Sequence, residues 1–127
     1  MSQYTILIIE DSPIELLHLK ETLTSQNISN YDTATKLEQA IGYLWTRNYD
    51  IVIAATGSSL IRPRALAEIH HHVPHYPKVL GLGNAPSDKQ YWYQVSTDSY
   101  LCHYFFERQE FYSKKNLQEI VRQQFSP

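Results

Sequence analysis

The fold is decided by residues 4–13, which read YTILIIEDSP. A short, nearly continuous apolar run with β-branched residues, Tyr4 to Ile9, is typical of a strand buried on both faces of a parallel sheet. Ser12 and Glu15 then form a capping box, with Pro13 at the first helical position. The helix that follows carries an apolar stripe, which comprises Ile14, Leu16, Leu17, Leu19 and Leu23. This pattern predicts a central strand, a tight turn and a helix.

Four later segments have the composition of further strands. Apolar runs at 50–55 and 78–82 each end at turn-forming residues, which is the pattern of buried parallel strands. A short, weak strand is expected around 28–33, and residues 100–105 supply the last strand. We expect an unusually long connection, Phe106 to Ser113, before the final helix.

Helical patterns separate these strands. Thr35 and Glu38 repeat the capping box, and Pro63 and Ser87 are suited to open two more helices. The apolar stripes expected to face the core are Leu37, Ala40, Ile41, Leu44 and Trp45 in the second helix and Leu117, Ile120, Val121 and Phe125 in the last. The chain therefore alternates strand with helix five times.

This alternation predicts the fold class. The connections are short, so each helix is expected to cross over in the right-handed sense between parallel strands. We predict an α/β fold, a flavodoxin-like (βα)5 doubly wound sandwich with a five-stranded parallel sheet. A chain of 127 residues, 43% of them hydrophobic, can bury one core, so residues 1–127 are expected to form a single domain.

Composition narrows the classes of partner. Eleven Lys and Arg residues stand against thirteen Asp and Glu residues, and no basic run could neutralise several phosphates, so we expect no direct binding of nucleic acid. The longest apolar run near the N-terminus, Ile6 to Ile9, is far shorter than a membrane span or the core of a signal peptide. We therefore expect a cytoplasmic protein that does not bind membranes.

Ligands of such sheets bind beyond the carboxyl ends of the strands, so the residues after each strand are the ones to inspect. The sequence ILIIEDSP at 6–13 resembles the opening of a response regulator receiver domain, in which paired acids after the first strand hold Mg²⁺. The resemblance continues over nearly the whole chain through segments at 34–40, 49–53 and 98–101. It implies a signalling domain of the two-component, phosphorelay type.

The resemblance also implies that the phosphoryl-transfer site of the family is degenerate in this chain. Receiver domains phosphorylate an Asp at the end of the third strand, and that position falls on Ala55, or on Ala54 after a slip of one residue. Neither side chain has a nucleophilic oxygen. The family's Thr or Ser after the fourth strand aligns with Leu82 or Gly83. Its lysine aligns with His103, which at its ordinary pKa is mostly neutral at pH 7.

Glu10 and Asp11 are what remains of the acidic site. A third carboxylate and a phosphate are both missing, so we expect no cofactor and at most weak binding of Mg²⁺. We interpret the pair as a solvated acidic loop end close to helix N-termini. The expected function is signalling through protein contacts, without phosphorylation of Asp and without enzymatic activity. The alternatives are a receiver that still binds a divalent cation or a phosphoryl group through Glu10 and Asp11, with a non-standard acceptor, and a flavodoxin-like domain that binds a small ligand.

Aromatic residues gather late in the chain. Three in succession, 91–93, cannot all face the core from one helix, and exposed Tyr and Trp are enriched at interfaces. In the family that the chain resembles, the fourth helix, fifth strand and fifth helix form the face that contacts partners or dimerises. The resemblance therefore implies a signalling kinase, an output protein or a second copy as partner, and the candidate contact residues are Tyr91, Trp92, Tyr100 and Tyr104. The alternative is that these rings pack under the connection at 106–113.

A histidine cluster at 70–75 offers a weaker signal. Adjacent helix positions point about 100° apart, so His70, His71 and His72 do not share a face as paired metal ligands would. His71 and His75 have the required spacing, but Pro74 interrupts the helix between them. We interpret the cluster as a solvated helix end.

Overall fold

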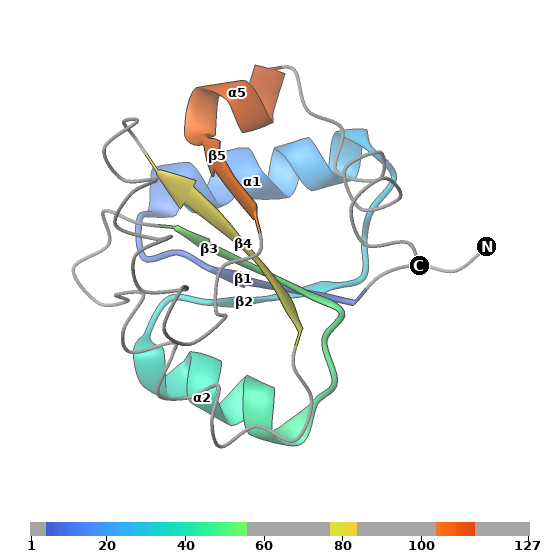
Figure 1. Ribbon diagram of the computed structural model, residues 1–127, viewed down its shortest axis with the longest axis vertical. Helices are drawn as coiled ribbons and strands as arrows, with labels where there is room; N and C mark the ends of the chain where they lie inside the picture. Colours follow the sequence, from blue (N-terminus) through green and yellow to red (C-terminus); the bar gives the residue numbers. More distant parts are fainter. Residues whose placement is uncertain (1–4, 56–76, 84–103, 114–127) are drawn as a thin grey trace.

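The computed structural model describes residues 5–55, 77–83 and 104–113. Its five strands are all parallel and form one sheet in the order β2-β1-β3-β4-β5 (Figure 1). This is the strand order of a flavodoxin-like doubly wound sheet, and it confirms the predicted fold class. The strands are β1 (Ile6–Ile9), β2 (Tyr31–Ala34), β3 (Ile51–Ala55), β4 (Lys78–Gly83) and β5 (Tyr104–Glu107).

Helices cover both faces of the sheet. The described residues contain α1 (Pro13–Ser25), α2 (Leu37–Thr46) and α5 (Arg108–Ser113). Figure 1 shows α1 and α5 on one side of the sheet and α2 on the other. The helices predicted to open at Pro63 and Ser87, the histidine cluster, and the apolar stripe at 117–125 lie outside the described residues. None of the helices in the described ranges is long and apolar enough to cross a bilayer.

Helix α1 begins as predicted. Ser12 is its N-cap and accepts a hydrogen bond from the N–H of Glu15 at 3.4 Å. Pro13 is the first residue of the helix. The apolar stripe is narrower than predicted. Leu19 and Leu23 are fully buried, whereas the side chains of Ile14 and Leu17 are 68% and 55% exposed. Each of these two lies two residues from a core-facing leucine, and a step of two residues turns the helix by about 200°.

The start of α2 differs from the predicted capping box. The N-cap is Lys36, which makes no side-chain capping hydrogen bond, so the prediction of Thr35 as the cap is wrong. Gln39, three residues after Lys36, instead accepts a hydrogen bond from the N–H of Thr35 at 3.0 Å. This hydrogen bond joins the first turn of α2 to the residue before the N-cap, so it differs from a capping box, in which the N–H of the N-cap itself is the donor. The stripe buries Ala40 and Leu44, but Trp45 is 53% exposed, contrary to the prediction.

Strand β5 lies further along the chain than predicted. Its register with β4 runs from Leu80 opposite Tyr104 to Gly83 opposite Glu107, and α5 begins at the next residue. The predicted strand at 100–105 therefore ends two residues too early, and its residues 100–103 lie outside the described residues. The predicted connection at 106–113 is wrong, because this segment contains the end of β5 and a helix anchored by the fully buried Phe111.

The main core lies between the sheet and the two helices α1 and α5. Side chains alternate along a strand, so Ile6 and Ile8 of β1 face this core while Leu7 and Ile9 face the opposite side. Glu10 continues the alternation of Ile6 and Ile8, which directs its side chain toward α1 and α5. The core residues on this side are Ile6, Ile8, Leu19, Leu23, Ile28, Ile51, Ile53, Leu80, Leu82 and Phe111.

A polar cluster ties β2 to the turn between α2 and β3. The hydroxyl of Tyr49 donates to Oδ2 of Asp32 at 2.6 Å, and Nη1 of Arg47 donates to the same oxygen at 2.8 Å. The hydrogen bond from Tyr49 has the largest single effect on the pKa of Asp32, and the hydrogen bond and charge of Arg47 act in the same direction. Together they lower the pKa of Asp32 below its ordinary value against the opposing effect of burial.

Tyr49→Phe is expected to raise the pKa of Asp32 toward its ordinary value, as followed in an NMR titration of the carboxyl carbon. A carboxyl group with a depressed pKa in the folded state adds stability above the pKa of the unfolded chain. That contribution is lost as the pH falls through the folded value. The variant should therefore lose less stability on acidification than the wild type does. Arg47→Met should also raise the pKa of Asp32, and a midpoint that does not move in Tyr49→Phe would contradict the assignment.

Candidate functional site

Three of the predicted site positions lie side by side at the carboxyl edge of the sheet. Ile9 pairs with Ala54, so Glu10 and Ala55 each lie one residue further along neighbouring parallel strands. Ala55 in turn pairs with Leu82 on β4, which is fully buried. The structure therefore brings these three positions to one level of the sheet. Their predicted roles stay predictions, as does that of His103, which lies outside the described residues.

Glu10 is a buried carboxylate and not part of a solvated loop end. Its side chain is only 1% exposed. Oε1 accepts a hydrogen bond from the N–H of Ser12 at 3.0 Å, and Oε2 accepts one from Nη2 of Arg108 at 2.7 Å. The solvated interpretation of Glu10 is wrong because the side-chain alternation of β1 places it under α5, whose first residue supplies a guanidinium group. Asp11, the next residue, is half-buried.

Arg108 binds a second acid at the same time. Its Nη1 donates to Oε2 of Glu15 at 3.1 Å, and the Arg108 side chain is 8% exposed. The hydroxyl of Tyr112, one turn further along α5, donates to the same Glu15 oxygen at 2.8 Å. These four side chains form a connected polar network, Glu10–Arg108–Glu15–Tyr112, that joins the end of β1 to α1 and α5.

The donors of this network keep their protons at neutral pH. Burial by itself would lower the pKa of Arg108, but the interactions with Glu10, followed by those with Tyr112, outweigh burial together, and the pKa is raised. Burial, followed by the hydrogen bond to Glu15, raises the pKa of the Tyr112 hydroxyl. The network therefore consists of fixed donors directed at two carboxylates, and none of its members is arranged as an activated nucleophile.

Arg108 is not among the site residues predicted from the sequence. Its partners Glu10 and Glu15 lie 98 and 93 residues away along the chain, beyond the reach of any local pattern. A signal was nevertheless present, because Arg108, Phe111 and Tyr112 have the spacing of one helical face. The same residues were predicted to belong to a long connection, 106–113, so this helical spacing was not interpreted as a helix.

The described donor set does not fit a divalent cation. Mg²⁺ requires near-octahedral coordination by oxygen atoms, usually from one or two carboxylates together with waters and phosphate. Both oxygens of Glu10 already accept hydrogen bonds, and Ala55 contributes no carboxylate on the neighbouring strand. Within the described ranges, no group of three or more His, Cys, Asp or Glu side chains is placed to hold a metal ion.

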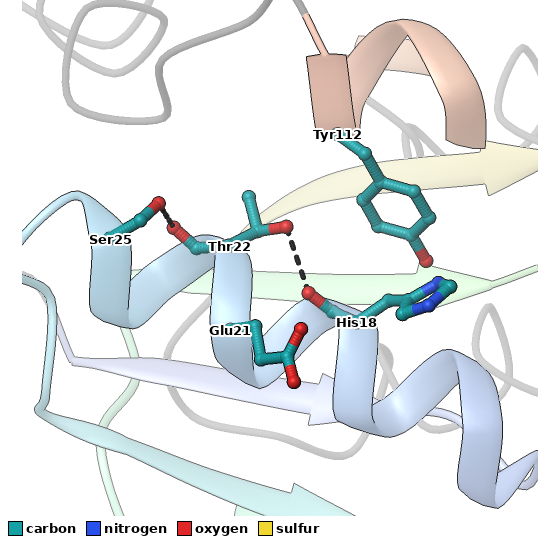
Figure 2. Close-up of a pocket in the computed structure, with 5 residues that line it drawn as sticks. All are labelled: His18, Glu21, Thr22, Ser25 and Tyr112. Carbon is teal, nitrogen blue, oxygen red and sulfur yellow. Dashed lines mark hydrogen bonds between the residues drawn. The ribbon is translucent and has the colours of Figure 1, made fainter.

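A shallow hollow of about 320 Å³ lies beside α1, lined by His18, Glu21, Thr22, Ser25 and Tyr112 (Figure 2). The rings of His18 and Tyr112 meet edge to face, with centroids 5.5 Å apart. The hydroxyls of Thr22 and Ser25 donate to carbonyl groups of α1 at 2.8 and 2.7 Å. Both hydroxyls therefore make hydrogen bonds within α1, and neither is placed as an activated nucleophile in the hollow.

Comparisons with known proteins identify the fold. No family model matches the chain, and no curated protein matches it. Among solved structures, the signal receiver domain of an HD domain-containing protein from Pseudomonas fluorescens Pf-5 matches with a TM-score of 0.74 and 21% identity, over 99% of this chain and 100% of that one.

Two further receiver domains match over similar lengths. The receiver domain of a sensor histidine kinase from Pseudomonas aeruginosa PAO1, solved with magnesium in its active site cleft, has a TM-score of 0.72 and 15% identity, covering 97% of this chain and 98% of that one. A CheY-like receiver domain protein from Methanospirillum hungatei JF-1 has a TM-score of 0.69 and 13% identity, with 96% and 90% covered. The chain therefore has the fold of response regulator receiver domains.

Proposed function

We propose that residues 1–127 form a pseudo-receiver, a two-component signalling domain that acts through protein contacts without phosphorylation of an Asp. The observation that carries the proposal is Ala55, which ends β3 on a receiver fold and lies level with Glu10 and Leu82. An alanine has no oxygen to attack a phosphoryl group. The Glu10–Arg108 contact supports the proposal, because it engages the carboxylate that remains at this edge.

On this proposal the chain is not an enzyme and needs no cofactor. Its partner is a signalling kinase, an output protein or a second copy of the chain, and it acts in the cytoplasm without binding nucleic acid or membranes. The candidate contact residues are Tyr91, Trp92, Tyr100 and Tyr104. The first three lie outside the described residues, and Tyr104 is the first residue of β5, at one edge of the sheet.

Incubation with acetyl phosphate and Mg²⁺, followed by intact-protein mass spectrometry, tests the proposal. We expect no added phosphoryl mass on the wild type. Ala55→Asp alone should also fail to take up phosphate efficiently, since Leu82 offers no hydroxyl and His103 no permanent cation. Each such electrostatic partner is commonly worth about 2.7–4 kcal/mol of barrier. Stoichiometric, base-labile modification of the wild type would overturn the proposal, and rapid modification of Ala55→Asp would show that Leu82 and His103 matter little.

Trp92→Ala is expected to weaken self-association or capture of a signalling partner while leaving the monomer folded. A central aromatic anchor typically costs 2 kcal/mol or more on truncation, which is about thirtyfold in affinity. Analytical ultracentrifugation and denaturant melts of the same samples separate this outcome from a loss of folding. Trp45→Ala is the matched control, because Trp45 is an exposed tryptophan on α2 and should leave association unchanged. If Trp92→Ala mainly lowers the unfolding midpoint, the ring belongs to the core and the interface lies elsewhere.

A further inference from the structure

The buried acid at the end of β1 already has a cation. The side chains of Glu10 and Arg108 are 1% and 8% exposed, and their oxygen and nitrogen lie 2.7 Å apart. Such a charge-assisted hydrogen bond is short and directional. The carboxylate is therefore neutralised inside the protein, by a residue of the same chain.

We infer that the Arg108 guanidinium takes the place of a divalent cation beside Glu10, so that this edge of the sheet does not take up Mg²⁺. The inference concerns the cation and not the acceptor, and it holds independently of whether any residue of the chain is phosphorylated.

Two neighbours fix the guanidinium in this place. Phe111, three residues further along α5, is fully buried in the core and anchors the helix. Glu15 accepts hydrogen bonds from both Arg108 and Tyr112, so the second nitrogen of the guanidinium is also engaged. A planar guanidinium held by two carboxylates is preorganised, and less rotamer freedom is lost for each hydrogen bond it forms.

A metal ion at Oε2 of Glu10 would have to displace this group. It would otherwise lie within a few ångströms of a positive charge in a water-poor setting, where like charges repel strongly. Breaking the contact would also leave the buried Arg108 with only its longer contact to Glu15, at 3.1 Å, and loss of one partner of a buried ion pair is strongly unfavourable. Asp11, half-buried next to this pair, adds one carboxylate but does not remove the cost of displacing the guanidinium from Glu10.

Thermal melts of four proteins, with MgCl₂ or with NaCl of equal ionic strength, test the inference. The wild type should melt at the same temperature in both salts. Arg108→Ala should melt lower, by on the order of 10 °C. MgCl₂ should restore several degrees of that loss, because the ion can then neutralise Glu10. The double variant Glu10→Gln/Arg108→Ala should show no response to MgCl₂. Arg47→Ala, which removes an exposed ion pair with Asp32, is the matched control. Its melting temperature should stay close to that of the wild type and should not respond to MgCl₂.

Mn²⁺ used as a paramagnetic probe gives an independent readout. NMR signals of residues near Glu10 should broaden in Arg108→Ala and stay sharp in the wild type. Stabilisation of the wild type by MgCl₂, or broadening there that Glu10→Gln removes, would overturn the inference. It would also be overturned if Arg108→Ala did not respond to MgCl₂. If this variant is unfolded in metal-free buffer, its circular dichroism should recover with MgCl₂, and lack of recovery counts against the inference. None of these outcomes depends on phosphodonor labelling, so the proposed function stands or falls separately.

Discussion

Glu10→Ala is expected to lower the free energy of unfolding by about 3–5 kcal/mol, because it leaves the Arg108 guanidinium buried without its closest carboxylate. The large effect comes from the buried guanidinium, which then keeps only its longer contact with the more exposed Glu15. The intact pair is not worth this amount, since forming it requires removal of two ions from water. Urea denaturation at neutral pH measures the loss.

Two comparisons identify the origin of that loss. The double variant Glu10→Ala/Arg108→Ala should be more stable than Glu10→Ala alone, since the buried guanidinium is then gone and Glu15 is partly exposed and keeps its hydrogen bond from Tyr112. Arg47→Ala removes the exposed pair with Asp32, where the arginine side chain is 56% exposed, and should barely move the midpoint. If Glu10→Ala costs no more than Arg47→Ala, the Glu10–Arg108 contact does not contribute as the structure indicates.

Phe111→Ala is expected to cost about 3–5 kcal/mol of unfolding free energy. The ring is fully buried among the core residues of β1, β3, β4 and α1, and the six residues of α5 could not form a stable helix alone. Its truncation leaves a cavity and also loosens the element that carries Arg108.

Leu17→Ala serves as the control for Phe111→Ala. Leu17 is 55% exposed on the outer face of α1, so its truncation should change stability little. A loss in Phe111→Ala that resembles this control would mean that the aromatic ring is not part of the core. Guanidinium chloride melts of both variants, analysed with a common m-value, provide the comparison.

The beginning of the fold could be predicted from the sequence because its determinants are local. An apolar run gives β1, and Ser12, Pro13 and Glu15 lie within four residues and define the start of α1. The end of the described chain could not be predicted in the same way. Residues 100–106 form an apolar and aromatic run with one interruption, His103, and no glycine or proline to mark a boundary. The start of β5 is defined by its pairing with β4, Leu80 opposite Tyr104, which no local pattern contains.

The candidate site also has one part that could be predicted from the sequence and one part that depends on contacts between distant residues. The resemblance to receiver domains placed Glu10, Ala55 and Leu82 at the ends of the first, third and fourth strands, and strand register brings them level. Burial of Glu10 was missed because a carboxylate after a strand is usually solvated unless a partner reaches it. That partner, Arg108, comes from the opposite end of the described chain and depends on the position of α5.

The separation of 98 residues between Glu10 and Arg108 has a consequence for synthesis of the chain. At elongation rates of about 5–20 residues per second, Arg108 is made roughly 5–20 s after Glu10. Until then a nascent β1 has no counter-charge for its acid, and the core on the α1 side lacks Phe111. An unfinished chain cannot bury this carboxylate favourably. The N-terminal half is therefore expected to remain without a fully packed core on the ribosome until α5 emerges. Closure of the core and neutralisation of Glu10 therefore depend on the same late segment, α5.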